Sequence, residues 1–173
     1  MAIVKVSFVK PGKNVRAGAK ANIRYIQNRR GKEGAKITRT LFGSDGLMGR
    51  LEAYRMIDEA EQGSRFFRVI INFDAKAEDT ERDLQLEAVL QNVIHGLEEN
   101  LKRYVSYVGV VHDDHTPLRH IHALVIAKER LLPVQQMRHT ATQICLEQRR
   151  VRDLLHEQVR ERGDTVWQRE RSK

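Results

Sequence analysis

The chain has 173 residues, of which 40% are hydrophobic and 31% charged, a balance that suits one globular domain with its own core. Its single cysteine, Cys145, excludes a disulfide framework, and no apolar run reaches membrane-spanning length, which together favour a reducing, cytoplasmic compartment and no membrane partner. The net charge is +8, and residues 1–40 hold eleven basic residues but one acidic residue, Glu33. Such a basic segment is typical of a polyanion-binding face and favours nucleic acid over an anionic membrane surface.

The first third of the chain predicts one strand, two helices and two loops. Alternating apolar residues predict a strand over 2–9, and apolar residues at helical spacing predict a helix over 15–29. A glycine-containing basic segment follows this helix, and residues 41–46, rich in Gly, Ser and Asp, predict a further loop. A second helix is expected from about 47 to 61.

The middle of the chain predicts a buried strand followed by a long helix. Apolar side chains alternate along residues 65–73, which indicates a strand with one face in the core. The sequence Thr80-Glu81-Arg82-Asp83 matches a capping box and predicts the start of a helix that continues to about Lys102.

The last third predicts a hairpin and a long charged helix. Two apolar, β-branched runs joined by a short polar loop predict paired strands over 104–127. A helix is expected over 135–162, with Ile144, Val151 and Leu155 facing inward, and residues 166–173 are expected to form a polar tail. Residues 1–165 are thus predicted to form a single domain. The order of elements predicts an α+β fold with a central antiparallel sheet flanked by helices, the hairpin strands being central because both of their faces are apolar.

Three histidines of the predicted hairpin form the most informative pattern in the chain. With the hairpin centred near Thr116, His112 lies opposite His120, and His122 is the diagonal neighbour on the same face, because strand side chains alternate. Three imidazoles on one patch of a rigid sheet are typical of a divalent-metal site with open positions. The competing interpretation is three unrelated histidines on a half-buried hairpin.

The remaining histidines and the cysteine fit structural or surface roles. His115 lies in the hairpin loop, where it either contacts a phosphate or is solvated. His95 lies off the apolar stripe of its helix, and His139 and His156 lie in a charged helical region, so all three are expected at the surface. Cys145 has no activating partner nearby in sequence, so a buried structural thiol is expected.

Tyr25 is the tyrosine best placed to act as a nucleophile. It follows Arg24, precedes Arg29 and Arg30, and does not lie on the apolar stripe of its helix. A phosphodiester attracted by these cations would lie beside its hydroxyl group. The alternative is a half-buried structural aromatic residue, and Tyr54, flanked by Glu52 and Asp58, is the weaker nucleophile candidate.

Three motifs in this order resemble the relaxase domain of plasmid mobilization and conjugation systems, a group of HUH nucleases that nick single-stranded DNA. They are Tyr25-Ile26 followed by Arg29-Arg30-Gly31-Lys32, the strand 65–73, and His112-x-Asp114 with Thr116-Pro117 and His120-Ile121-His122, so the resemblance covers about residues 20–160. In many relatives the proline directly precedes the second histidine, whereas here Leu118 and Arg119 intervene. A tyrosine that precedes the histidine motif is the relaxase arrangement.

This resemblance implies strand-specific nicking at a transfer origin. The Tyr25 oxygen would attack the scissile phosphate, giving a 5′-phosphotyrosine and a free 3′-hydroxyl, with a divalent metal on His112, His120 and His122. The family generally uses Mg²⁺ or Mn²⁺, whereas three imidazoles also suit Zn²⁺ or Ni²⁺. Asp114 either orients one imidazole or is a solvated turn residue. Expected partners are single-stranded DNA and accessory relaxosome and secretion coupling proteins, around a monomeric chain.

Basic residues near Tyr25 are the expected contacts to the DNA backbone, and such contacts position DNA without specifying its sequence. They are Lys20, Arg24, Arg29, Arg30, Lys32 and Lys36. The segment 31–46 is expected to become ordered on DNA. Two rival functions remain: a metal-dependent phosphoesterase that uses activated water, which predicts no covalent adduct, and a non-catalytic DNA-binding relative, which predicts binding indifferent to Tyr25→Phe and to metal removal.

Overall fold

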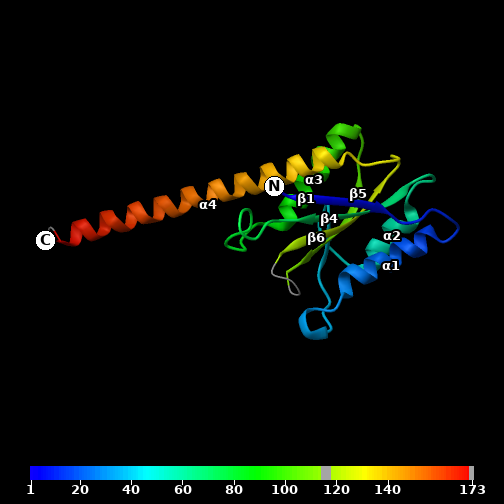
Figure 1. The fold of residues 1–173 in the computed structure, drawn as a ribbon, viewed down its shortest axis with the longest axis horizontal. Coiled ribbons are helices and arrows are strands. Elements are labelled where there is room, and N and C mark those ends of the chain that lie inside the picture. The colour runs from blue at the N-terminus through cyan, green and yellow to red at the C-terminus, as the bar shows by residue number, and fades with distance from the viewer. Residues whose placement is uncertain (114–117, 172–173) are drawn as a thin grey trace.

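The computed structural model describes residues 1–113 and 118–171, apart from the side chains of Lys32 and residues 161–171 (Figure 1). The elements, in chain order, are β1 (Ile3–Phe8), α1 (Val15–Asn28), a 3₁₀ turn (Lys32–Gly34), β2 (Leu41–Gly43), β3 (Gly46–Met48), α2 (Arg50–Glu59), β4 (Arg65–Asn72), α3 (Leu86–Leu101), β5 (Ser106–His112), β6 (His120–Ala127) and α4 (Val134–Arg171). Among the described residues, no helix combines the length and apolarity needed to cross a bilayer.

The strands form one antiparallel sheet in the order β1-β4-β6-β5-β2-β3. The hairpin strands β5 and β6 therefore lie in the middle of the sheet, as predicted from their two apolar faces. Every residue of β6 is buried. This confirms the predicted α+β fold with a central antiparallel sheet, and it gives the histidines a rigid support.

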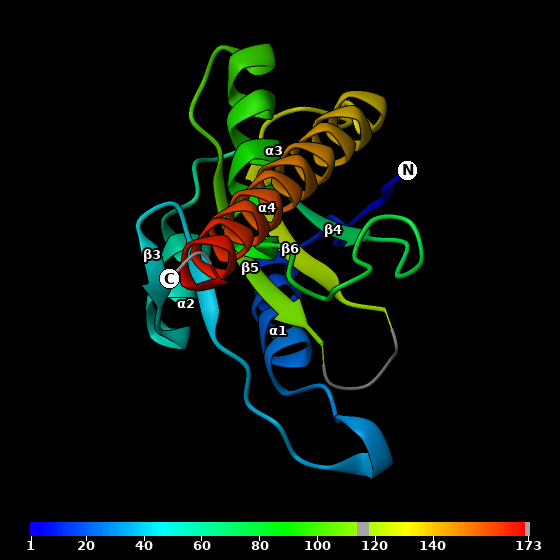
Figure 2. The same cartoon turned by 90° about the vertical axis from the view of Figure 1, so that its left-hand side faces the viewer.

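Helices cover both faces of the sheet, so the fold has three layers. On one face, α1 and α2 pack over Val108, Val110 and Leu124. On the other face, α3 and α4 pack over the alternate residues of the same strands, together with Phe67 and Val69 of β4. Figure 2 shows the sheet between α3 and α1. Because strand side chains alternate, even-numbered residues of β5 and β6 face α1, and this parity decides where the histidines point.

Helix α4 is longer than predicted and leaves the body of the domain. It runs to Arg171 rather than ending near 162, and it includes residues 166–171 of the expected tail (Figure 1). Ile144 packs against the core as expected, but Val151 and Leu155 are 48% and 55% exposed, so their predicted inward orientation is wrong. Val151 and Leu155 lie on the same side of α4 as its core-facing residues. This part of the helix projects past the sheet, so most of their apolar surface is uncovered.

Two local predictions are also wrong. Residues 41–48 form the short hairpin of β2 and β3 instead of a loop and the start of a helix, and α2 begins at Arg50. The capping box at Thr80 opens no helix, because Arg82 adopts a left-handed conformation with φ of 56° and the segment folds into turns around Asp79. Helix α3 begins later, at Leu86.

Candidate metal centre at the end of the central hairpin

The three histidines meet at the end of the sheet where the central hairpin closes. His112 pairs with His120 in the last register pair of β5 and β6, and His122 pairs with Val110. All three have even numbers, so their side chains share the face of the sheet that α1 covers. The register is the one that the sequence predicts for a hairpin centred near residue 116.

The rings lie close enough to share one ion. Their centroids are 5.2 Å apart for His112 and His120, 4.4 Å for His112 and His122, and 5.0 Å for His120 and His122. One nitrogen from each ring lies within 4.8 Å of the others, and all three residues are buried. Three imidazole nitrogens on rigid strands are a donor set that suits a divalent transition metal.

Hydrogen bonds to carbonyl groups fix the tautomer of two of the rings. Nε2 of His112 lies 2.7 Å from the carbonyl oxygen of Ile26, and Nδ1 of His120 lies 3.1 Å from that of Leu118. A carbonyl oxygen only accepts hydrogen bonds, so each of these nitrogens carries the hydrogen. The other ring nitrogen, Nδ1 of His112 and Nε2 of His120, then has the lone pair that binds a metal, and the carbonyl bond orients the ring, as metal-ligating histidines require. The residues present therefore fit a divalent metal.

The contact with Ile26 places the C-terminal end of α1 against the histidines. The last carbonyl groups of a helix have no partner inside the helix. In α1 they are used elsewhere: the Ile26 carbonyl accepts from His112, and the Gln27 carbonyl accepts from the backbone N–H of Arg39. The buried Arg39 guanidinium also donates to the carbonyl of Arg29, just past the helix. These bonds fix the helix end that carries Tyr25.

The structure separates the four tyrosines by accessibility. Tyr25 is 55% exposed on α1, whereas the hydroxyl oxygen of Tyr54 is buried. Tyr107 is in the core, and burial raises its pKa to about 12. Tyr104 is exposed, but it precedes β5, whose far end holds His112, and at about 3.3 Å per residue it lies roughly 26 Å from that histidine. Of the two exposed tyrosines, Tyr25 is the one next in sequence to Ile26, whose carbonyl His112 contacts.

The predicted phosphate contacts around Tyr25 fall into two groups. Arg24, Arg30 and Lys36 are exposed, and the Arg29 guanidinium lies 6.0 Å from the centre of the Tyr25 ring. Lys20 instead forms an ion pair with Asp58, with Nζ 2.6 Å from the carboxylate, so it lies on the side of α1 that faces α2. The Lys32 side chain lies outside the described residues.

The other predicted positions are settled only in part. His95, His139 and His156 are exposed, as expected for surface residues. Cys145 is buried, as expected for a structural thiol, and burial raises its pKa to about 12. Asp114 and His115 lie outside the described residues, so their roles stay predictions.

The sequence alone does not predict a largely buried pair of charges beside the centre. Asp79 and Arg119 are 3.2 Å apart, and their side chains are 3% and 14% exposed. The position of Arg119 directly before His120 is a clue in the sequence that this side chain could act near the centre. Asp79 offered none, because its partner is 40 residues away along the chain.

Comparisons of the chain with models of protein families, with curated proteins and with solved structures found no match. Function is therefore inferred from the residues themselves and from their arrangement. Those residues form a three-histidine centre, able to hold a divalent metal, in which His112 contacts the end of the helix that carries an exposed tyrosine.

Proposed function

We propose that this protein nicks single-stranded DNA by transesterification, with Tyr25 as the nucleophile and a divalent metal on His112, His120 and His122. The observation that carries the proposal is the bond from the His112 ring to the Ile26 carbonyl, which holds the tyrosine-bearing end of α1 at the histidine centre. We further propose a transfer origin as the substrate, on the basis of the resemblance to relaxases.

The chemistry requires a nucleophile that DNA can reach. In the proposed step the Tyr25 hydroxyl oxygen forms a bond to the scissile phosphorus while the bond from phosphorus to the 3′ oxygen breaks. The phenolic proton passes to solvent, and the departing 3′ oxygen takes up a proton. The products are a 5′-phosphotyrosine and a 3′-hydroxyl, so the phosphodiester is conserved and the strand can be rejoined. A bound divalent metal would supply charge neutralisation at the non-bridging phosphate oxygens.

The charge around Tyr25 supports a polyanionic substrate. Arg24 and Arg30 are exposed near it, and the Arg29 guanidinium lies over its ring. Guanidinium groups bind phosphate through two parallel hydrogen bonds and keep their charge at all physiological pH values. They would hold the DNA backbone against α1 without reading its bases.

A denaturing gel tests the proposal. Wild type, Tyr25→Phe and His120→Ala are incubated with Mn²⁺ and a labelled pool of single-stranded oligonucleotides of random sequence, and Tyr104→Phe is the control at an exposed tyrosine far from the centre. A labelled protein–DNA band that is lost in Tyr25→Phe and His120→Ala but kept in Tyr104→Phe supports the proposal.

The other outcomes identify the rival functions. Cleavage without a covalent band, unchanged in Tyr25→Phe, would indicate a metal-dependent phosphoesterase that uses water. DNA binding with neither cleavage nor a band, indifferent to both variants, would indicate a non-catalytic DNA-binding protein.

A further inference from the structure

The proposed metal ligands lie where three strands end. His112 and His120 form the last pair of β5 and β6, and His120 also forms the last pair of β6 with β4, opposite Asn72. Strand ends open locally more readily than strand centres, because they have neighbours on one side only. Two ligands of a metal centre therefore need further contacts to stay in place.

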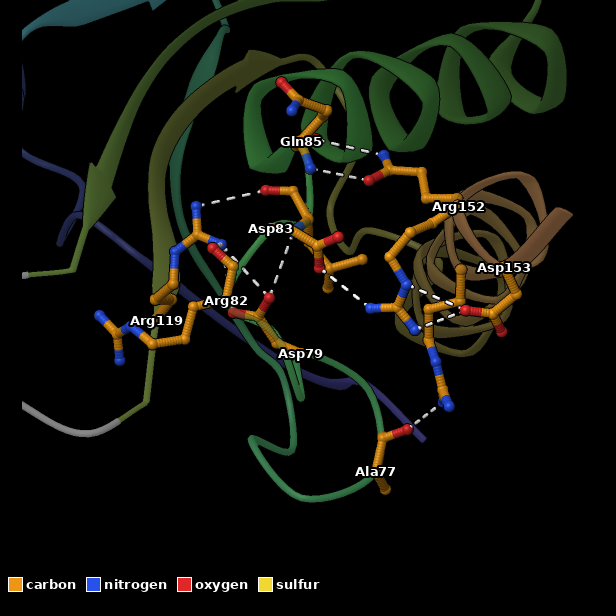
Figure 3. A network of polar contacts seen from close by, with 11 residues as sticks. Ala77, Asp79, Arg82, Asp83, Gln85, Arg119, Arg152 and Asp153 are labelled. Atoms are coloured by element: carbon orange, nitrogen blue, oxygen red, sulfur yellow. Dashed lines mark hydrogen bonds and ion pairs between the residues drawn. The ribbon is translucent and has the colours of Figure 1, made fainter. Parts of the chain in front are cut away.

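Arg119 provides such contacts immediately before His120. One of its terminal nitrogens donates to both carboxylate oxygens of Asp79, at 3.2 and 3.3 Å, and to the carbonyl of Arg82 at 2.7 Å. The other donates to the carbonyl of Leu84 at 3.2 Å. Figure 3 shows Arg119, the residue before β6, reaching into the loop that connects β4 with α3. The guanidinium thus fixes the start of β6 to residues 79–84.

Arg82 makes the matching contact on the other strand of the hairpin. Its guanidinium donates to the carbonyl of Asp113, the residue that follows His112, at 3.1 Å. Asp79 also folds the loop on itself, because its carboxylate accepts from the backbone N–H of Leu84 and its carbonyl accepts from that of Arg82. Both ends of the hairpin loop are therefore attached to one short segment.

We infer that Asp79, Arg82 and Arg119, here called the hairpin clamp, are positioning residues that set the metal affinity of the histidine centre. This inference rests on the proposed metal site. Arg82 binds the backbone after His112, and Arg119 is itself the residue before His120, so the clamp acts by keeping both ligands in register. An Arg–carboxylate pair that is also bonded to two carbonyls has one well-defined geometry, which a flexible lysine does not reproduce.

The same loop contains a matched control. Asp83 pairs with Arg152 of α4 at 3.2 Å, and Figure 3 shows this pair on the side of the loop that faces α4. It connects the same segment to the body of the domain and, among the described residues, makes no hydrogen bond or ion pair with the hairpin. Removing it tests whether any disturbance of the loop is enough to affect the centre.

The test measures the Kd for Mn²⁺ by isothermal titration calorimetry on the full chain, for wild type, Asp79→Asn, Arg119→Lys, Arg82→Gln and the control Asp83→Asn. The expected loss of affinity is about tenfold or more for Asp79→Asn and Arg119→Lys, the size typical of residues that orient metal ligands. Arg82→Gln is expected to lose less, and Asp83→Asn is expected to match wild type.

Two further readouts separate positioning from general stability. The visible spectrum of bound Co²⁺ reports coordination geometry, and it should change in Asp79→Asn and Arg119→Lys but not in Asp83→Asn. The Tm of metal-free protein reports folding. If a buried-charge variant fails to fold, the exposed Arg82→Gln decides, because it removes the guanidinium contact with Asp113 and leaves the Asp79–Arg119 pair in place.

The outcomes distinguish this inference from the proposed function. Unchanged Kd and Co²⁺ spectrum in the clamp variants, with affinity lost in His120→Ala, would overturn the clamp while leaving the metal centre in place. Affinity that survives His120→Ala would place the ion elsewhere and overturn both. A loss of equal size in Asp83→Asn would show a general effect of the loop, and that also contradicts the inference.

Discussion

His112 donates the hydrogen on Nε2 to the carbonyl oxygen of Ile26 over 2.7 Å, which joins the end of the central strand β5 to the last turn of α1. The bond uses a helix-end carbonyl that has no partner within the helix, and it selects the histidine tautomer that leaves Nδ1 with a lone pair. One contact between residues 86 positions apart thus orients a proposed metal ligand, His112, and holds Ile26, the neighbour of Tyr25.

Removing one histidine should abolish tight metal binding without unfolding the protein. His120→Ala takes away one of three nitrogen donors, so we expect the affinity for Mn²⁺ to fall by more than about tenfold. Isothermal titration calorimetry measures the change. His95→Ala is the control, because His95 is exposed on α3 and has no part in the cluster. Equal affinities for the two variants would mean that the histidine cluster does not hold the ion.

DNA binding should depend on salt through the exposed arginines of α1 and its end. Each contact with a single-strand phosphate contributes about 0.7 to the slope of log affinity against log salt concentration. Arg24→Ala and Arg30→Ala should each reduce the slope by about that amount. Lys20→Ala should leave the slope unchanged, since Lys20 is engaged by Asp58. Fluorescence anisotropy of a labelled oligonucleotide over a series of NaCl concentrations checks this, and identical slopes in all four proteins would contradict it.

Gly109→Ala should destabilise the centre of the sheet. A Cβ atom at this position would lie 2.5 Å from Phe42 and 2.6 Å from Leu90, in a packed core. Overpacking of this kind costs about 1–3 kcal/mol. Gly49→Ala is the matched control, because its added Cβ meets nothing within 4 Å, and a change within about 0.5 kcal/mol is expected. Urea unfolding measures both free energies, and equal values would refute the close approach of Phe42 to the strand.

Cys145 should be unreactive in the folded protein. Burial raises the pKa of its thiol to about 12, and the carboxylates of Glu78 and Asp79 add to the rise. The thiol stays neutral when folded, whereas an unfolded thiol ionises near its ordinary pKa. The neutral thiol therefore makes its full contribution to the free energy of unfolding below about pH 8.5. This contribution is lost as pH rises toward 12.

Labelling with a thiol reagent at pH 8 should accordingly be slow in buffer and fast in guanidinium chloride. The free energy of unfolding of wild type should also fall more steeply between pH 9 and 11 than that of Cys145→Ala. Rapid labelling of the folded protein would place the thiol at the surface instead.

Local patterns predicted the elements that are long and regular. The alternation in 65–73 and the apolar stripe from Leu86 identified β4 and α3, because a period of two or 3.6 residues is a property of the local chain. The short hairpin at 41–48 was missed, since two strands of three residues carry too few side chains to show a period. The capping box at Thr80 matches the local motif, but the hydrogen bonds of Asp79 with Leu84 and with the distant Arg119 hold the segment in turns instead.

By itself the sequence determined that His112, His120 and His122 share one face of a hairpin, because strand alternation and a short loop leave little choice of register. The tertiary structure alone decided what surrounds them: the Ile26 carbonyl beside His112, the Asp79–Arg119 pair beside His120, and the exposure of Val151 and Leu155 on α4. These contacts join residues far apart in the chain, or depend on where the sheet ends. They arise from the packing of whole layers, which a local hydrophobic period does not encode.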